Sequence, residues 1–120
     1  MSEDVGHADC LFCRIVAHEV PSTVVVESEL SLAFRDISPV APTHVLVIPK
    51  AHYRDPSELA EADPAALSDL FLTAHEVARL EGLTERGYRV VLNTGRDAGQ
   101  TVFHAHAHVL GGRDLRWPPG

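Results

Sequence analysis

Residues 103–110 read FHAHAHVL, an alternation of histidine with apolar residues that ends on two apolar side chains. Side chains of a β-strand point to opposite faces in turn, so the alternation predicts a strand over residues 101–110. Its three histidines, His104, His106 and His108, would share one face at a spacing of about 6.6 Å. The stretch therefore predicts a sheet with one face packed on a core and the other carrying a row of imidazoles.

The rest of the chain predicts further strands and one long helix. Short β-branched or apolar runs occur at residues 23–27, 30–35, 44–49 and 88–93. Asp63 and Pro64 form a good helix start, and apolar residues recur with helical spacing up to Gly82, a natural stop. A short helix is expected over residues 10–16. We therefore expect an α+β fold with a mainly antiparallel sheet, one long helix and a short N-terminal helix.

Size and charge restrict the class of protein. The 120 residues suit one domain over residues 10–120, the C-terminal WPPG included, after a flexible stretch over residues 1–9. The net charge of -7 argues against a polymeric nucleic acid as partner but leaves a small nucleotide open. No apolar run approaches the roughly 20 residues of a membrane span, and no signal peptide is apparent, so a cytoplasmic protein without membrane contact is expected.

Three interpretations of the histidine row are open from the residues alone. It can be a solvated face, a metal site built by two or three imidazoles, or a nucleophilic histidine held in one tautomer by its neighbours. The preceding loop at residues 93–101 contains an amide, two glycines and a hydroxyl, and such glycine loops bind anions through backbone N–H groups. The loop favours a phosphate brought to an imidazole.

Several motifs resemble those of the histidine triad superfamily. The HAHAHVL run at residues 104–110 matches its alternating signature throughout. The motifs that are similar to its Hint branch are FRDISP at 34–39, PTHVLVIPK at 42–50, GQTVF at 99–103 and WPPG at 117–120. The resemblance extends from about residue 10 to residue 120 and implies a HIT-like fold and a homodimer. It also implies hydrolysis of nucleoside 5′-phosphoramidates or aminoacyl adenylates through a nucleotidyl-histidine intermediate, with release of the nucleoside monophosphate.

The resemblance assigns roles to single residues. It implies that His106 is the nucleophile, that His108 contacts a phosphate oxygen and that His44 orients the site. Thr101 stands where relatives commonly carry serine and would act near the leaving group. The implied contacts to a purine nucleotide are Asp36 at the ribose, Ile37 at the base, and Asn93, Gly99, Gln100, Thr101, His106 and His108 around the phosphate. Adenine and guanine are both open as the base.

Cys10 and Cys13 form a C-x-x-C pair, which alone is compatible with redox chemistry, metal binding or coincidence. A four-coordinate zinc ion needs two further ligands. Some histidine triad proteins bind structural zinc through such a pair and two histidines, and the resemblance implies His44 and His104 at those positions. A metal-free dithiol is the alternative, and the chemistry itself is expected to need no cofactor. The remaining histidines are expected at the surface or in packing: His7, His18, His52 and His75.

Two other functions compete with the phosphoramidase. A metallohydrolase would use His104, His106 and His108 as ligands of an ion that activates water. A nucleotide-binding module would bind without turnover. The resemblance also implies that the apolar tail around Trp117 packs near the active site across a two-fold dimer, and the alternative is a tail that folds back on its own subunit.

Overall fold

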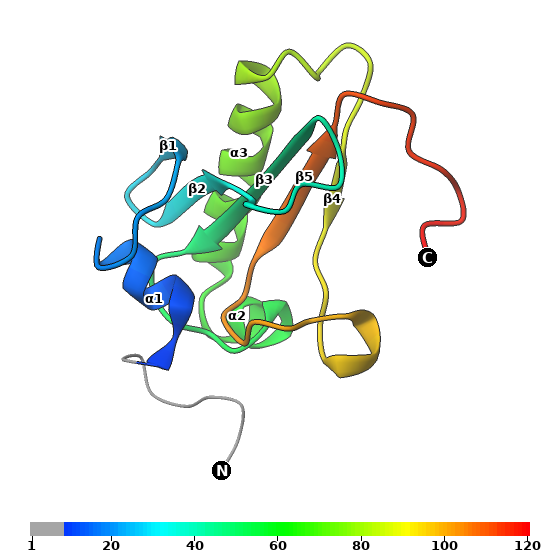
Figure 1. Ribbon diagram of the computed structural model, residues 1–120. Coiled ribbons are helices and arrows are strands. Elements are labelled where there is room, and N and C mark those ends of the chain that lie inside the picture. The colour runs from blue at the N-terminus through cyan, green and yellow to red at the C-terminus, as the bar shows by residue number, and fades with distance from the viewer. Residues whose placement is uncertain (1–8) are drawn as a thin grey trace.

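The computed structural model describes residues 9–120 and contains one five-stranded sheet with three α-helices (Figure 1). The strands lie in the order β1-β2-β3-β5-β4, and every adjacent pair is antiparallel. The strands are β1 Val24–Glu27, β2 Ser31–Arg35, β3 Thr43–Pro49, β4 Arg89–Val91 and β5 Ala107–Gly111. The helices are α1 Leu11–Val16, α2 Pro56–Ala62 and α3 Pro64–Leu80. The expected α+β class, with one long and one short N-terminal helix, is confirmed. The flexible stretch expected before residue 9, with His7, lies outside the described residues.

The long helix α3 begins where its sequence predicts. The Asp63 side chain accepts a hydrogen bond from the Ala66 N–H at 3.2 Å, and Pro64 occupies the first turn, where no N–H is needed. The helix α2 was not expected, although Asp55 and Pro56 repeat the same start signal and Asp55 accepts from the Glu58 N–H at 2.8 Å. Its seven residues are too short for a clear apolar period.

Strand β3 is buried on both faces, as its apolar sequence predicts, and it separates two cores. Val45 and Val47 pack with α3 on one face of the sheet. Leu46 and Ile48 pack with α1 on the other face, and His44 shares their side of the strand. The imidazole row therefore lies on the face that the short helix covers.

The last strand begins later than predicted. It starts at Ala107 rather than at residue 101, so His108 lies in β5 while His104 and His106 precede it. The β3–β5 ladder runs from Thr43 paired with Gly111 to Val47 paired with Ala107. The next hydrogen-bonded pair in this register would join Pro49 to Ala105, and Pro49 has no N–H to donate, so the ladder ends before it.

Among residues 9–120, no helix is long and apolar enough to cross a membrane.

Candidate active site

His106 is held in one tautomer by the backbone of its neighbour. Its Nδ1 lies 2.8 Å from the carbonyl oxygen of His104. A carbonyl can only accept a hydrogen bond, so Nδ1 carries the proton and Nε2 keeps its lone pair. The ring is buried, and Phe12 packs edge-on against it at a centroid distance of 5.2 Å. The arrangement leaves a neutral imidazole whose nucleophilic nitrogen is defined.

The tautomer of His108 follows from a short chain of hydrogen bonds. The Val40 N–H donates to Nδ1 of His44 at 3.1 Å, so His44 carries its proton on Nε2. That Nε2 lies 2.9 Å from Nδ1 of His108 and donates to it. The proton of His108 is therefore on its Nε2. The His106 and His108 rings lie 5.0 Å apart between centroids, so a lone pair and an N–H donor are placed side by side.

Both imidazoles are neutral near pH 7. Burial lowers the pKa of His106, although the hydrogen bond to the His104 carbonyl and the charge of Asp36 oppose this. Burial lowers the pKa of His108 to about 4, assisted by the neighbouring His106 and His44 and opposed by Asp36. Both side chains are therefore present at neutral pH as the neutral tautomers that their hydrogen bonds select.

An apolar cavity of about 410 Å³ adjoins the histidines through two of its lining residues, Phe12, which packs on His106, and Asp36, which lies near His44. Leu11, Phe12 and Ile15 of α1 line one side, and Asp36 and Ile37 lie at its edge after β2. One carboxylate oxygen of Asp36 accepts the Ser38 N–H at 2.7 Å, and the other lies 3.4 Å from Nε2 of His44. A flat apolar ring fits this cavity, with a carboxylate available for hydroxyl donors beside it.

The other expected contacts lie on the loop before the histidines, and they differ in how far their side chains are exposed. Thr101 and Gly99 are exposed, and Asn93 is half-buried. Gln100 is only 4% exposed, and its amide bonds to the backbone of three other residues. Its side chain is thus not directed to a ligand, in contrast to the expected phosphate contact.

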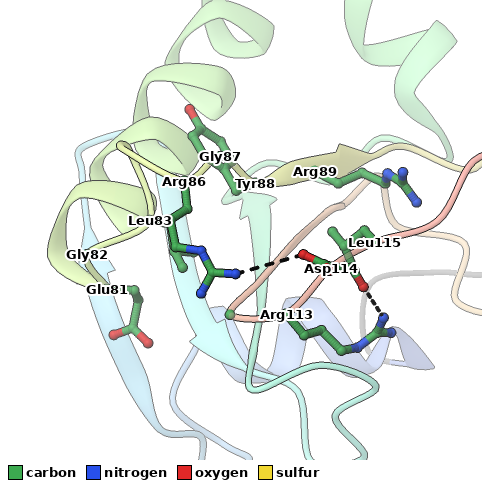
Figure 2. A pocket seen from close by; sticks show the side chains of 11 residues that line it. Glu81, Gly82, Leu83, Arg86, Gly87, Tyr88, Arg89, Arg113, Asp114 and Leu115 are labelled. Carbon is green, nitrogen blue, oxygen red and sulfur yellow. Dashed lines mark hydrogen bonds and ion pairs between the residues drawn. The ribbon is translucent and has the colours of Figure 1, made fainter.

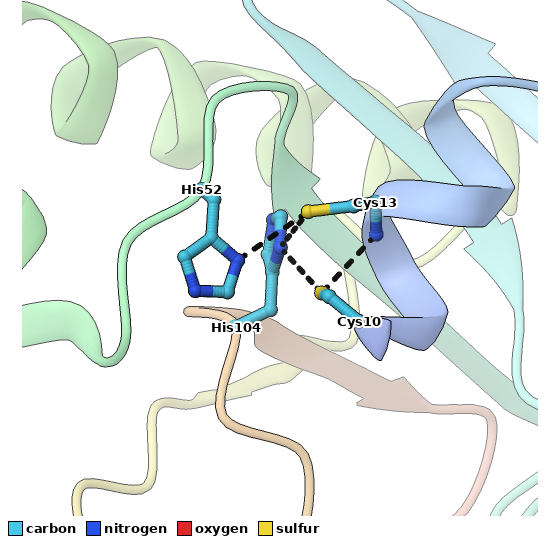
Figure 3. A group of neighbouring side chains, drawn as sticks. All are labelled: Cys10, Cys13, His52 and His104. Carbon is cyan, nitrogen blue, oxygen red and sulfur yellow. Dashed lines mark hydrogen bonds between the residues drawn. The ribbon is translucent and has the colours of Figure 1, made fainter. Parts of the chain in front are cut away.

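A second cluster of side chains joins α1 to the segment that follows β3 and to the segment that precedes β5 (Figure 3). The four side chains that lie within ligand distance of one another are Cys10, Cys13, His52 and His104. Nδ1 of His104 lies 3.3 Å from Sγ of Cys10 and 3.5 Å from Sγ of Cys13. Nδ1 of His52 lies 3.3 Å from Sγ of Cys13.

This cluster fits a tetrahedral zinc ion. Zinc bonds of about 2.3 Å to sulfur and about 2.05 Å to nitrogen give a sulfur–nitrogen edge of about 3.5 Å, close to the observed spacing. His104 is fully buried, and its Nε2–H donates to the Pro49 carbonyl at 2.8 Å, which leaves Nδ1 as the ligand atom. The donor set of two thiols and two imidazoles is one that structural zinc sites use.

The structure places His52, and not the expected ligand His44, beside the two cysteines. His44 pairs with Leu110 inside the β3–β5 ladder, and its Nε2 is engaged with His108. His52 follows β3 just after Pro49, where the chain lies against residues 104–105. In the β3–β5 register, residue 50 would oppose His104 and residue 52 would oppose residue 102, so His52 lies close to His104, but the sequence alone does not supply this register.

The geometry disfavours the three-histidine metal site. In the part of the chain that the structure describes, the two possible metal-ligating groups are the Cys10, Cys13, His52 and His104 cluster and a group of Asp36, His44 and His108. Neither contains the three histidines of the row together. His104 turns toward the thiols and His106 binds a backbone carbonyl, so their ring nitrogens do not converge.

A larger cavity of about 610 Å³ lies away from the histidines (Figure 2). It lies between the α3–β4 connection and the start of the C-terminal tail. Its arginines contact neighbouring groups of the chain itself, as in the Arg86–Asp114 ion pair at 3.8 Å and the Arg113 bond to the Val40 carbonyl at 3.0 Å. The side chain of Trp117, further along the tail, is 81% exposed.

Comparisons with known proteins agree with these features. The family model described as the HIT domain matches residues 17–115. An uncharacterised HIT-like protein of Synechococcus elongatus is 51% identical over 112 residues, which cover 93% of this chain and 97% of the relative. A HIT family hydrolase of Legionella pneumophila Philadelphia 1 has a TM-score of 0.89 and 48% identity, covering 93% of this chain and all of that one. A HIT family hydrolase of Clostridium thermocellum has a TM-score of 0.86 and 46% identity, covering 90% of this chain and 94% of that one. The chain therefore belongs to the histidine triad, or HIT, family.

Proposed function

We propose that this protein is a hydrolase of the Hint type that cleaves nucleoside 5′-phosphoramidates and aminoacyl adenylates. The observation that carries the proposal is the pair of complementary tautomers. Nε2 of His106 offers a lone pair, and Nε2–H of the adjacent His108 offers a proton, beside a cavity that suits a nucleoside. The hydrolases among the structural relatives support the general class.

The reaction follows from these two nitrogens. Nε2 of His106 attacks the α-phosphorus and forms an N–P bond while the bond to the leaving group breaks. For a phosphoramidate, the departing amine takes up a proton from water, while Nε2–H of His108 keeps its proton and donates a hydrogen bond to a phosphate oxygen, where charge develops. Water then attacks the nucleotidyl-histidine, the N–P bond breaks, and the nucleoside monophosphate leaves with His106 neutral again.

Binding of the nucleotide uses the groups around the histidines. The purine would occupy the cavity beside α1, next to Ile37, and the carboxylate of Asp36 would accept hydrogen bonds from the ribose hydroxyls. Asn93, Gly99 and Thr101 would face the phosphate side. A zinc ion would be held by Cys10, Cys13, His52 and His104, where it fixes α1 against the segments that carry His52 and His104.

We also propose a homodimer. Strand β4 is an edge of the described sheet, and the outward side of α3 exposes Phe71 and Leu72. His75 of α3 bonds to the Tyr88 hydroxyl just before β4, so these two surfaces adjoin. Sedimentation equilibrium tests the assembly, and a monomer at micromolar concentration would refute it.

Hydrolysis of adenosine 5′-phosphoramidate by wild type and His106→Ala tests the function, with His18→Asn as a control at an exposed position outside the site. We expect turnover by wild type and by the control, and none by His106→Ala. Acid quenching should trap a nucleotidyl group on the peptide that contains His106. Wild-type rates in His106→Ala would refute the covalent mechanism. Loss of activity on chelation of an enzyme that stays folded would favour the metallohydrolase, and AMP binding without turnover would favour the binding module.

A further inference from the structure

The polar atoms of the Gln100 side chain all form hydrogen bonds with other groups of the protein. Its Oε1 accepts the Gly95 N–H at 2.8 Å, and its Nε2 donates to the carbonyl oxygens of Arg54 at 2.8 Å and Val102 at 3.0 Å. Its own backbone N–H donates to the Gly95 carbonyl at 3.1 Å. Both amide protons, the amide oxygen and the backbone N–H are therefore engaged, and the side chain is only 4% exposed.

The segment that Gln100 closes has glycine hinges at both ends. Gly95 has a φ of +88° and Gly99 a φ of +93°, and a single 3-10 turn, Arg96–Ala98, lies between them. These left-handed positions allow the tight turn but also allow many other conformations. The side chain of Gln100 joins the first hinge to residues beyond the second, so it selects one shape of the loop.

The same amide ties the loop to a rigid support. Arg54, whose carbonyl accepts from Gln100, has its N–H bonded to the Glu58 carboxylate at the start of α2. Its neighbour Tyr53 accepts the Ala105 N–H at 2.7 Å. The loop is thus fixed both to the start of a helix and to the segment between His104 and His106.

The residue after Gln100 is differently placed. Thr101 is exposed, and its N–H and hydroxyl have no hydrogen-bond partner among residues 9–120. Gln100 thus fixes one side of the loop, and Thr101 carries the available hydrogen-bond donors on the other side. A phosphate-binding loop requires both features.

We propose that Gln100 is a positioning residue, which holds the loop of residues 95–101 so that Thr101 faces the phosphate, and which does not itself touch the nucleotide. The proposal rests on the proposed phosphoryl site but concerns how that site is shaped. It replaces the expected direct phosphate contact of Gln100 by an indirect one.

Two variants of Gln100 test whether its buried bonds serve the phosphate side of the site and not the nucleoside cavity. Gln100→Glu keeps the acceptor for the Gly95 N–H but turns an oxygen toward two carbonyl oxygens, and Gln100→Met removes all three side-chain bonds at similar length. A matched control is Asp69→Leu, because Asp69 accepts two part-buried hydroxyl bonds outside the site, from Ser28 at 2.6 Å and Ser31 at 2.7 Å, and leucine removes the acceptor. The control should lose comparable thermal stability without a change in kinetics.

The measurements compare ligands with and without a phosphate. We expect both Gln100 variants to lower kcat for adenosine phosphoramidate by about 10- to 100-fold and to weaken AMP binding by about tenfold. Adenosine, which lacks the phosphate, should bind within about twofold of wild type, because the cavity beside α1 is untouched. Equal losses of adenosine and AMP affinity, or unchanged kcat and AMP affinity, would overturn the proposal. Wild type that binds AMP without turnover would refute the proposed reaction, while the AMP–adenosine comparison would still test Gln100.

Discussion

Replacing His44 tests whether its hydrogen bond selects the tautomer of His108. The Val40 N–H fixes Nδ1 of His44 as an acceptor, and Nε2–H of His44 donates to His108 at 2.9 Å. Phenylalanine keeps the ring in the buried position but removes both bonds. Without the bond from His44, nothing favours the form of His108 that carries its proton on Nε2. The other form, with the proton on Nδ1, presents a lone pair on Nε2 where a hydrogen-bond donor is needed.

The size of the effect follows from that bond. A net hydrogen bond contributes about 0.5–1.5 kcal/mol between neutral groups and about 1.5–3 kcal/mol when a charge is involved. Charge develops at the phosphate in the transition state, so a loss of about 1.4–2.7 kcal/mol is expected for His44→Phe. This corresponds to a fall in kcat of about 10- to 100-fold. KM should change less, because the nucleoside cavity is not altered.

Steady-state hydrolysis of adenosine phosphoramidate measures the fall. Thr43→Val is the matched control, because Thr43 precedes His44 in β3 but points to the other face, where its hydroxyl bonds to Glu81 at 3.3 Å. The control should keep wild-type kcat with a small loss of stability. His44→Phe with at least half of the wild-type kcat would refute the tautomer argument, provided that thermal unfolding shows it folded.

Three further outcomes are expected. His52→Ala should lose the bound zinc, measured by metal analysis, and should unfold at lower temperature than wild type, whereas His18→Asn should keep its zinc and its unfolding temperature. Because burial lowers the pKa of His108 to about 4, the unfolded chain binds more protons between about pH 6.5 and pH 4, so stability falls as pH falls through that window. The stability of His108→Asn should fall less between pH 7 and pH 5, and equal slopes in thermal unfolding would contradict this. Asp36→Asn should raise KM for a ribonucleotide substrate by about tenfold and for its 2′,3′-dideoxy analogue little, and equal increases would exclude a ribose contact.

Much of the fold could be predicted because its signals are local. The Asp63–Pro64 start of α3 and the apolar run of β3 each depend on residues that are adjacent in the sequence. The helix α2 carries the same start signal, but seven residues do not give a periodicity that can be recognised. The late start of β5 could not be read from residues 101–110, because its cause is Pro49 on the neighbouring strand.

The site was predictable by residue type and less so by arrangement. The alternation placed His106 and His108 together, and the structure brings His44 and Asp36 beside them. The choice between His44 and His52 at the cysteines depended on register past the end of the ladder. The tautomers depend on the Val40 N–H and the His104 carbonyl, and backbone groups carry no sequence signal.

The departure of residues 101–106 from a regular strand is itself a condition for the chemistry. In a ladder bonded on both sides, the carbonyl of His104 would be taken by a neighbouring strand. Because the β4–β5 ladder ends at Val91 paired with His108, that carbonyl is available to hold Nδ1 of His106 at 2.8 Å.

The irregular segment then needs other supports, and three are present: the bond from Ala105 to Tyr53, the amide of Gln100, and the anchoring of the His104 ring by Pro49 and the cysteines. His104 therefore acts twice, since its ring belongs to the metal-binding cluster and its carbonyl sets the tautomer of the proposed nucleophile. A change in the cysteine cluster should accordingly affect the reaction through the position of one carbonyl, even though no cluster atom reaches the phosphate.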